Sequence, residues 1–152
     1  MRDAQDVTVF LSYARSDHRS REIADQVLRV LGENGVTAWD DRMIEPGSNW
    51  AELVDEALSH ARMFVLMIPP ESQRSARLYF DIGAAVARAT EAPDEVRLIP
   101  ILVHGDGRSE LPRRLMRWSA IDSADLPVGD VAEEIGKAVL RWEERSHEKA
   151  RA

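Results

Sequence analysis

The chain has 152 residues, a formal net charge of -7 at pH 7 and no cysteine. This length fits one domain, and the lack of cysteine excludes a disulfide framework, a thiolate zinc site and a cysteine nucleophile. The acidic balance argues against binding to a nucleic-acid backbone, which needs a basic surface. No apolar run reaches the ~18 residues of a membrane helix, and residues 1–6 do not resemble a signal peptide. We therefore expect a cytoplasmic protein without nucleic-acid or membrane partners.

Short apolar runs alternate with amphipathic segments through the first half of the chain. Val7–Leu11 and Val36–Trp39 are rich in β-branched and aromatic residues, which predicts two buried strands. Met63–Ile68 is apolar throughout, as is typical of a strand covered on both faces. Ser48 or Asn49 is expected to cap the helix that precedes this third strand. Apolar residues recur with helical spacing in both intervening segments: Ile23, Val27, Val30 and Leu31, then Leu53, Val54, Ala57 and Leu58.

The second half continues the same alternation. A helix is predicted over residues 75–89, because its apolar residues lie on one face. A strand is predicted over Val96–Val103, where Pro100 suits a place near an edge or a bulge. A short helix over Leu111–Trp118 and a last strand over Ser119–Asp122 follow.

The chain ends in one more amphipathic helix and a polar tail. We expect a single domain over residues 1–145 and a tail over 146–152. The repeated strand–helix alternation predicts an α/β fold, a flavodoxin-like three-layer sandwich with a roughly five-stranded parallel sheet and helices on both faces. Functional residues of such a sheet gather at the carboxyl ends of its strands. The apolar face of the last helix comprises Val131, Ile135, Ala138, Val139 and Trp142.

Several well-known binding motifs are missing from the sequence. No Walker loop and no G-x-G-x-x-G follows the first predicted strand, which argues against phosphate cradles of those kinds. The aspartates and the lysine of a phospho-receiver do not stand at the ends of the corresponding strands. No metal site is expected, because the four histidines share no ligand spacing: His18, His60, His104 and His147.

Three segments in order resemble the motifs of TIR (Toll/interleukin receptor) domains. Residues 9–17, VFLSYARSD, are similar to the first box, in which an apolar strand runs into F-[IL]-S-Y-x-x-x-D. Residues 39–50 resemble the second box, the BB loop that follows the second strand. Residues 75–87 resemble the third-helix segment, S-x-W-x-x-x-E-[IL]-x-x-A. The resemblance covers roughly two thirds of the chain and looks most like the bacterial branch of the family.

The resemblance implies signalling, of the kind used in immunity, through homotypic assembly. TIR domains associate through the BB loop and neighbouring helices, so the expected partners are other TIR domains, in homo- or hetero-oligomers. An acidic pair beside an arginine in this loop can also match a basic surface on a neighbour. The loop residues in this sequence are Asp40, Asp41, Arg42, Met43, Ile44, Glu45, Pro46 and Gly47.

The resemblance also implies an enzymatic activity, because many TIR domains cleave NAD+ at its nicotinamide–ribose bond. A third-helix glutamate orients the ribose and stabilises an oxocarbenium-like transition state, and an aromatic residue one turn earlier lies beside the nicotinamide. Here the motif W-x-x-x-E reads Arg77-x-x-x-Asp81, and Pro69 replaces the usual serine after the third strand. The shorter carboxylate and the adjacent arginine predict weakened NAD+ glycohydrolase or cyclase activity. NAD+ is then a substrate, and no tightly bound cofactor is expected.

Several interpretations of these residues stay open. The pair Arg77–Asp81 can be a solvated helix pair, Tyr13 can pack on the third helix, and Trp50 can staple its helix to the core. Two alternative functions are an active NAD+ nucleosidase that uses Asp81, and an enzyme similar to nucleoside deoxyribosyltransferases, which break N-glycosidic bonds with carboxylates. The candidate NAD+ site comprises Asp81 as the catalytic carboxylate, surrounded by Ser12, Tyr13, Arg42, Trp50 and Arg77.

Overall fold

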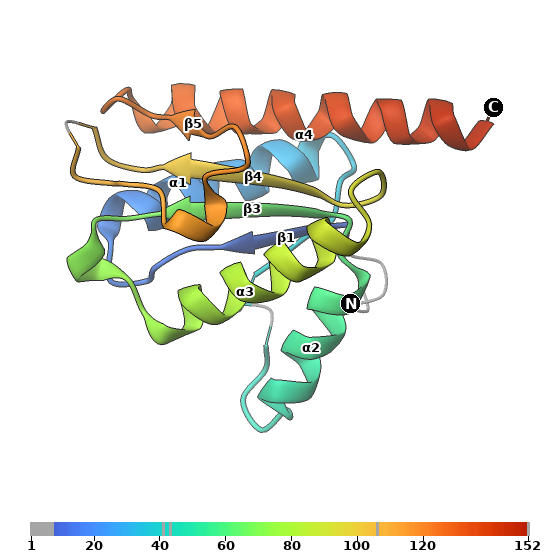
Figure 1. The fold of residues 1–152 in the computed structure, drawn as a ribbon, viewed down its shortest axis with the longest axis horizontal. Coiled ribbons are helices and arrows are strands. Elements are labelled where there is room, and N and C mark those ends of the chain that lie inside the picture. Colours follow the sequence, from blue (N-terminus) through green and yellow to red (C-terminus); the bar gives the residue numbers. More distant parts are fainter. Residues whose placement is uncertain (1–7, 41, 43, 106, 152) are drawn as a thin grey trace.

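A computed structural model contains one sheet of five parallel strands in the order β2-β1-β3-β4-β5 (Figure 1). It describes residues 8–40, 42, 44–105 and 107–151. Parallel pairing places the carboxyl ends of all strands at one edge, where their following loops meet. The strands are β1 (Val9–Ser12), β2 (Ala38–Trp39), β3 (Met63–Ile68), β4 (Arg97–Leu102) and β5 (Ile121–Asp122).

Helices cover both faces of the sheet (Figure 1). Helices α1 and α4 share one half of the core, whereas α2 and α3 share the other half. Within the described ranges, every helix is too short or too polar to span a lipid bilayer. The helices are α1 (His18–Glu33), α2 (Trp50–His60), α3 (Ala76–Glu91) and α4 (Val128–Arg151), with 3-10 turns η3 (Glu71–Gln73) and η4 (Arg113–Leu115).

Alternating side chains of the central strands divide the core into two halves. Phe10 of β1 and Phe64 of β3 face α2 and α3, and the Phe10 ring stacks on Trp39 with centroids 4.9 Å apart. Val9 and Val65 face α1 and α4 on the other side of the sheet. Strand β3 is buried along its whole length because it lies in the middle of the sheet between the two helical layers. Its position explains the continuous apolar run in the sequence.

Side-chain caps fix the points at which three of the helices begin. The side chains of Asp17, Asn49 and Ser75 each accept a hydrogen bond from the backbone N–H three residues further on. Such caps satisfy N–H groups that have no partner within the helix. Two of them follow strands β1 and β3 closely, so they also set the geometry of the loops at the carboxyl edge of the sheet.

The predicted fold class is confirmed, although some element boundaries differ from the prediction. Within Leu111–Trp118, expected to be a short helix, only Arg113–Leu115 forms a 3-10 turn. The segment from Ser146, expected to be a polar tail, extends α4 as far as Arg151. This segment is rich in glutamate, lysine and arginine and has no glycine or proline to end the helix. Val7, placed in the first strand, lies outside the described residues.

Candidate functional site

A buried carboxylate joins the end of β1 to α3. Ser12, the last residue of β1, donates a hydrogen bond from Oγ to Asp81 Oδ2 at 2.7 Å. Arg77, one turn earlier in α3, donates from Nε to Asp81 Oδ1 at 3.1 Å. The Asp81 side chain is only 3% exposed, so this is a partly buried ion pair rather than a solvated helix pair. Both carboxylate oxygens are engaged, as a buried charge requires.

Trp50 connects the start of α2 to this ion pair. The Arg77 guanidinium carbon lies 4.7 Å from the centroid of the Trp50 ring, which is the geometry of a cation–π contact. Trp50 is 49% exposed, so its indole lies on the surface and not in the core. The indole therefore holds Arg77 against α3 while part of the ring stays open to solvent, which differs from a helix staple buried in the core.

The ion pair limits what Asp81 can do in this conformation. A ribose hydroxyl reaches the carboxylate only by replacing the hydrogen bond from Ser12 or the one from Arg77. The guanidinium also cancels much of the negative charge that would stabilise a developing sugar cation. The geometry therefore favours a structural pair over a carboxylate that is ready for catalysis.

A second polar cluster fixes the base of the loop that follows β2. Asp40 is buried and accepts hydrogen bonds from the Arg42 backbone N–H at 2.8 Å and from its guanidinium at 2.8 Å. The Tyr13 hydroxyl donates to the same carboxylate at 3.4 Å. Arg42 also pairs with Asp25 of α1. The hydrogen bond to Asp40 raises the pKa of Arg42 above its ordinary value, with a smaller contribution from Asp25.

The tip of this loop is an exposed turn. The Ser48 N–H donates to the Glu45 carbonyl at 3.1 Å, which closes four residues around Pro46 and Gly47. Gly47 has a φ of 89°, in the left-handed region that favours glycine. Proline at the second position and glycine at the third are the residues of a type II turn. Residues 45–50 are all exposed, so a fixed base carries a shaped and accessible tip.

A cleft of about 470 Å³ opens between α1 and the base of this loop. Ser12 ends β1 and Tyr13 follows it, and their side chains lie on opposite sides of the sheet. Tyr13 and Arg42 therefore line this cleft, whereas Ser12 contacts Asp81 on the side of α3. The residues of the predicted NAD+ site thus form two adjoining clusters. The cleft is lined by Tyr13, Arg15, His18, Arg21, Glu22, Asp25 and Arg42.

The three segments with TIR-like motifs meet at one edge of the sheet. Within the loop, Ile44 packs against the core, which anchors the strand side of the turn. Asp41 and Met43, also assigned to the loop, lie outside the described residues. Three contacts join the segments pairwise: Ser12 with Asp81, Tyr13 with Asp40, and Trp50 with Arg77.

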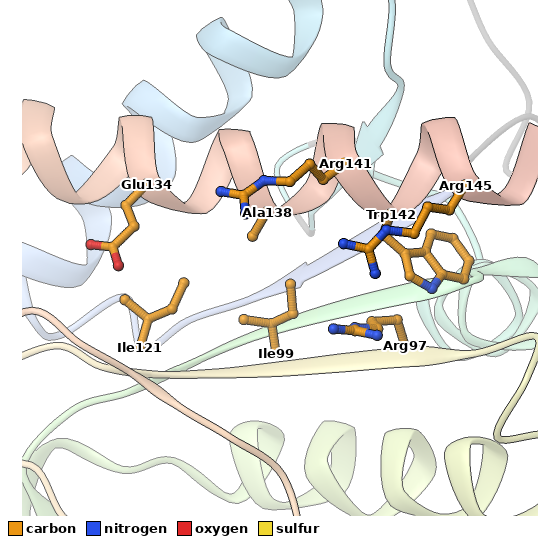
Figure 2. A pocket seen from close by; sticks show the side chains of 8 residues that line it. All are labelled: Arg97, Ile99, Ile121, Glu134, Ala138, Arg141, Trp142 and Arg145. Carbon is orange, nitrogen blue, oxygen red and sulfur yellow. The ribbon is translucent and has the colours of Figure 1, made fainter.

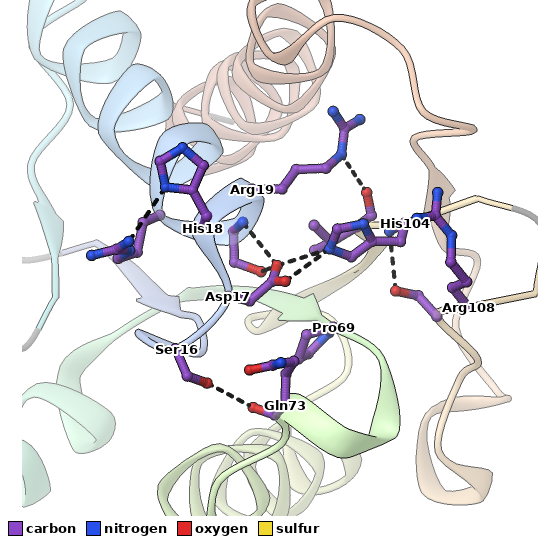
Figure 3. A network of polar contacts seen from close by, with 12 residues as sticks. Ser16, Asp17, His18, Arg19, Pro69, Gln73, His104 and Arg108 are labelled. Atoms are coloured by element: carbon purple, nitrogen blue, oxygen red, sulfur yellow. Dashed lines mark hydrogen bonds and ion pairs between the residues drawn. The ribbon is translucent and has the colours of Figure 1, made fainter.

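A further polar network at this edge is absent from the sequence-based prediction. Figure 3 shows Asp17, the cap of α1, bound to His104, which follows β4. The Ser20 hydroxyl also donates to Asp17. The His104 Nε2 atom lies 2.9 Å from Asp17 Oδ1, across 87 positions in the sequence. Arg19 donates to the Val103 carbonyl at 2.7 Å and reinforces the same link. The sequence held one signal for this contact. Asp17 and His104 both follow the carboxyl ends of predicted strands, where the loops of a parallel sheet meet.

We expect the free energy of unfolding of Asp17→Asn to fall less steeply with decreasing pH than that of the natural protein. Burial opposes the ionisation of Asp17, but hydrogen bonds from Ser20 and His104 outweigh it and place its pKa below the ordinary value of 3.8. Such a group contributes stability that is fully present above 3.8 and is lost as the pH falls through the folded-state pKa. Urea denaturation between roughly pH 5 and pH 2 measures this slope. Asp94→Asn, on an exposed loop, serves as the control, and equal slopes for both variants would contradict the assignment.

Comparison with known families identifies this arrangement. The family model described as TIR domain matches residues 9–139, which include all three motif segments. The chain belongs to the TIR domain family. Its BB loop is therefore the segment Asp40–Gly47, with the exposed turn at its tip, and its third helix is α3. The placement in the bacterial branch stays a prediction.

Solved structures agree with this TIR fold. The TIR domain of the Toll-related receptor TRR-2 from Hydra magnipapillata matches with a TM-score of 0.63 at 19% identity, covering 88% of this chain and 94% of that one. A flavodoxin-like domain from Synechococcus sp. matches with a TM-score of 0.59 at 20% identity, covering 94% and 99%. At these identities the likeness shows the fold alone. No curated protein matches the chain at a significant level.

Proposed function

We propose that this TIR domain is an assembly module whose BB loop docks onto another TIR domain, and that its NAD+ cleavage is weakened. The proposal rests on the contrast between the base of the BB loop and its tip. Its base is fixed by Asp40 and Arg42, whereas its tip around Pro46 and Gly47 is exposed and shaped by the turn. A preorganised exposed turn binds with little loss of conformational entropy, which favours docking.

Exposed aromatic side chains after the turn and on α3 support docking at this place. Trp50 is 49% exposed and Phe80 is 57% exposed. Phe80 follows Arg77 by three residues, so it is its neighbour on the surface of α3, and Arg77 in turn contacts Trp50. Aromatic residues and arginine dominate the energetic centres of protein interfaces. We call Glu45–Gly47, Trp50 and Phe80 the loop surface.

Loss of the turn is expected to weaken association. In the double variant Pro46→Ala with Gly47→Ala, alanine at Gly47 must adopt the φ of 89° and the fixed proline φ is lost. We expect the dissociation constant to rise about 10-fold, since a strain of roughly 1–2 kcal/mol opposes the bound shape. Sedimentation velocity over a range of concentrations measures it. Gly35→Ala is a matched control, because Gly35 has a φ of 74° at the opposite edge of the sheet. Equal dissociation constants for the natural protein, the double variant and Gly35→Ala would contradict the proposal.

NAD+ cleavage is the second candidate function. Asp81 at the family's glutamate position, bonded to Ser12 and close to Trp50 through Arg77, is the observation that favours it. Its ion pair with Arg77 favours a low rate, and an active nucleosidase is the alternative. Nicotinamide release by pure protein at high concentration decides between them. Release that survives Asp81→Ala would exclude Asp81 as the ribose carboxylate.

An enzyme of the nucleoside deoxyribosyltransferase type is the least favoured function. It would use carboxylates on a similar fold, but it would leave the exposed turn of the BB loop without a role. Transfer of the deoxyribosyl group from a deoxynucleoside to a second, free base, with release of the first base, distinguishes it from NAD+ cleavage, because neither nicotinamide nor ADP-ribose is involved.

A further inference from the structure

A pocket at the opposite end of the sheet from the BB loop gathers positive charge. It has a volume of about 200 Å³ and lies between α4 and the strands β4 and β5. Arg97 begins β4, so the pocket is at the amino ends of the strands. In Figure 2, Arg145 extends from α4 toward the strand that carries Arg97, whereas Arg141, which also lines the pocket, lies along α4. Two separate elements thus contribute three arginines to one pocket, with Trp142 beside them.

Within the part of the chain that the structure describes, the three arginines of this cluster, Arg97, Arg141 and Arg145, have no ion-pair partner. The chain as a whole has a net charge of -7, so this cluster of three arginines is opposite in sign to the net charge of the protein. Their mutual repulsion is relieved most directly by an anion. Guanidinium groups hold phosphate oxygens in a two-pronged geometry that lysine does not reproduce.

The remaining walls of the pocket suit a sugar rather than a bare anion. Ile99 provides an apolar floor between the two ends. Glu134 lies at the end away from Arg145, and the eleven positions between them correspond to ~16 Å along a helix. A carboxylate there can accept hydrogen bonds from sugar hydroxyls while the arginines hold a phosphate.

We propose that this pocket binds a phosphate-bearing small molecule, a sugar phosphate or a nucleotide. Arg97 and Arg145 bind the phosphate, Arg141 adds positive charge above it, and Glu134 accepts from the sugar hydroxyls. The indole of Trp142 forms the wall beside the phosphate, while Arg62 already lies 5.8 Å from its ring centroid. The pocket is independent of the BB loop and of Asp81.

Calorimetric titration with pyrophosphate, ribose 5-phosphate and ADP at low salt tests the proposal. We expect the double variant Arg97→Gln with Arg145→Gln to weaken binding about 100-fold, roughly 10-fold for each charge-assisted contact. The double variant Arg29→Gln with Arg113→Gln is the matched control. Both arginines are exposed and neither lines the pocket, and their substitution removes the same amount of positive charge. ADP or ribose 5-phosphate binding tighter than pyrophosphate supports the proposal, whereas sugar-bearing ligands that bind no tighter than pyrophosphate would contradict the role of the sugar.

Two results would overturn the proposal. One is that none of the three ligands binds, or that both double variants bind them equally. The other is that Arg97→Gln with Arg145→Gln reduces self-association while phosphate binding is undetectable, which would assign the arginines to an acidic surface of a second copy. A measurement on the unmodified protein avoids any folding defect of the variants. Pyrophosphate should shift the indole N–H resonance of Trp142 and leave that of Trp50 unchanged, and the reverse pattern would also overturn the proposal.

Discussion

Replacing Arg77 by tryptophan and Asp81 by glutamate together is expected to raise the rate of nicotinamide release from NAD+ by about 100-fold over the natural sequence. Glutamate extends the carboxylate by one methylene, and a misplacement near 1 Å at a reacting centre costs about that factor. Removal of the guanidinium frees the charge that now pairs with Asp81 at 3.1 Å. Tryptophan also restores an aromatic residue beside Trp50. The release is followed by chromatography at high protein concentration.

Two variants separate the causes in this experiment. Asp81→Glu alone keeps Arg77 beside the carboxylate, so we expect a much smaller gain. Adding Asp81→Gln to Arg77→Trp retains the length of glutamate without its charge, and its rate should fall back to that of the natural protein. If the Trp–Glu variant is folded by circular dichroism and shows no gain, the ion pair is not what limits NAD+ cleavage.

Loss of both aromatic groups of the loop surface is expected to weaken self-association by at least 30-fold. Trp50→Ala with Phe80→Ala removes two side chains that are 49% and 57% exposed in the single chain. A central aromatic residue of an interface contributes about 2 kcal/mol, and 1.4 kcal/mol corresponds to a factor of ten, so the loss of one such contribution already gives about 30-fold. The measurement is sedimentation equilibrium over a wide concentration range. Neither residue is part of the buried core, so the free energy of unfolding should change little.

Met116→Ala is the matched control for this prediction. Met116 is 67% exposed, ends η4 and is not one of the residues of the loop surface. Its removal takes away exposed apolar area without touching the loop surface, so association should be unchanged. If Met116→Ala weakens association as much as the double variant does, general surface hydrophobicity rather than the loop surface drives assembly.

The fold could be predicted because local and global signals agree. The apolar run Met63–Ile68 is typical of a strand covered on both faces, and it occupies the middle of the sheet. Strand–helix alternation then left few topologies open, since parallel strands need right-handed crossovers. Pro100 was placed near an edge, and β4 is indeed next to the edge strand β5, which pairs with it only at Ile101 and Leu102.

The structural features that the sequence did not predict depend on long-range contacts or on small differences in free energy. The pairing of Asp17 with His104 spans most of the chain, and no periodicity reports which loops meet. The extension of α4 through the polar C-terminal residues required weighing helix propensity against fraying, and the lack of a stop signal decided it. Helix ends are the least certain features of any sequence-based prediction because they involve few contacts.

The location of the candidate site could be predicted from the sequence, but the contacts between its side chains could not. The motifs placed Ser12, Asp81 and Trp50 at one edge, and the structure brings their segments together. The i, i+4 spacing suggested that Arg77 could pair with Asp81, but a sequence cannot show that Trp50 covers the guanidinium. Burial of the carboxylate, which changes the pair from a weak surface interaction to a fixed one, follows only from the packing of α3 on β1.

Hydrogen–deuterium exchange as a function of protein concentration tests most directly whether the BB loop is the docking element. Residues 45–50 at the tip are exposed in the single chain, and apart from the Ser48 N–H, which is bonded within the turn, their amides should exchange fast when dilute; Pro46 has no amide hydrogen. We predict that they become protected over the same concentration range in which sedimentation detects association. Association that proceeds while these amides continue to exchange at the dilute rate would contradict the account.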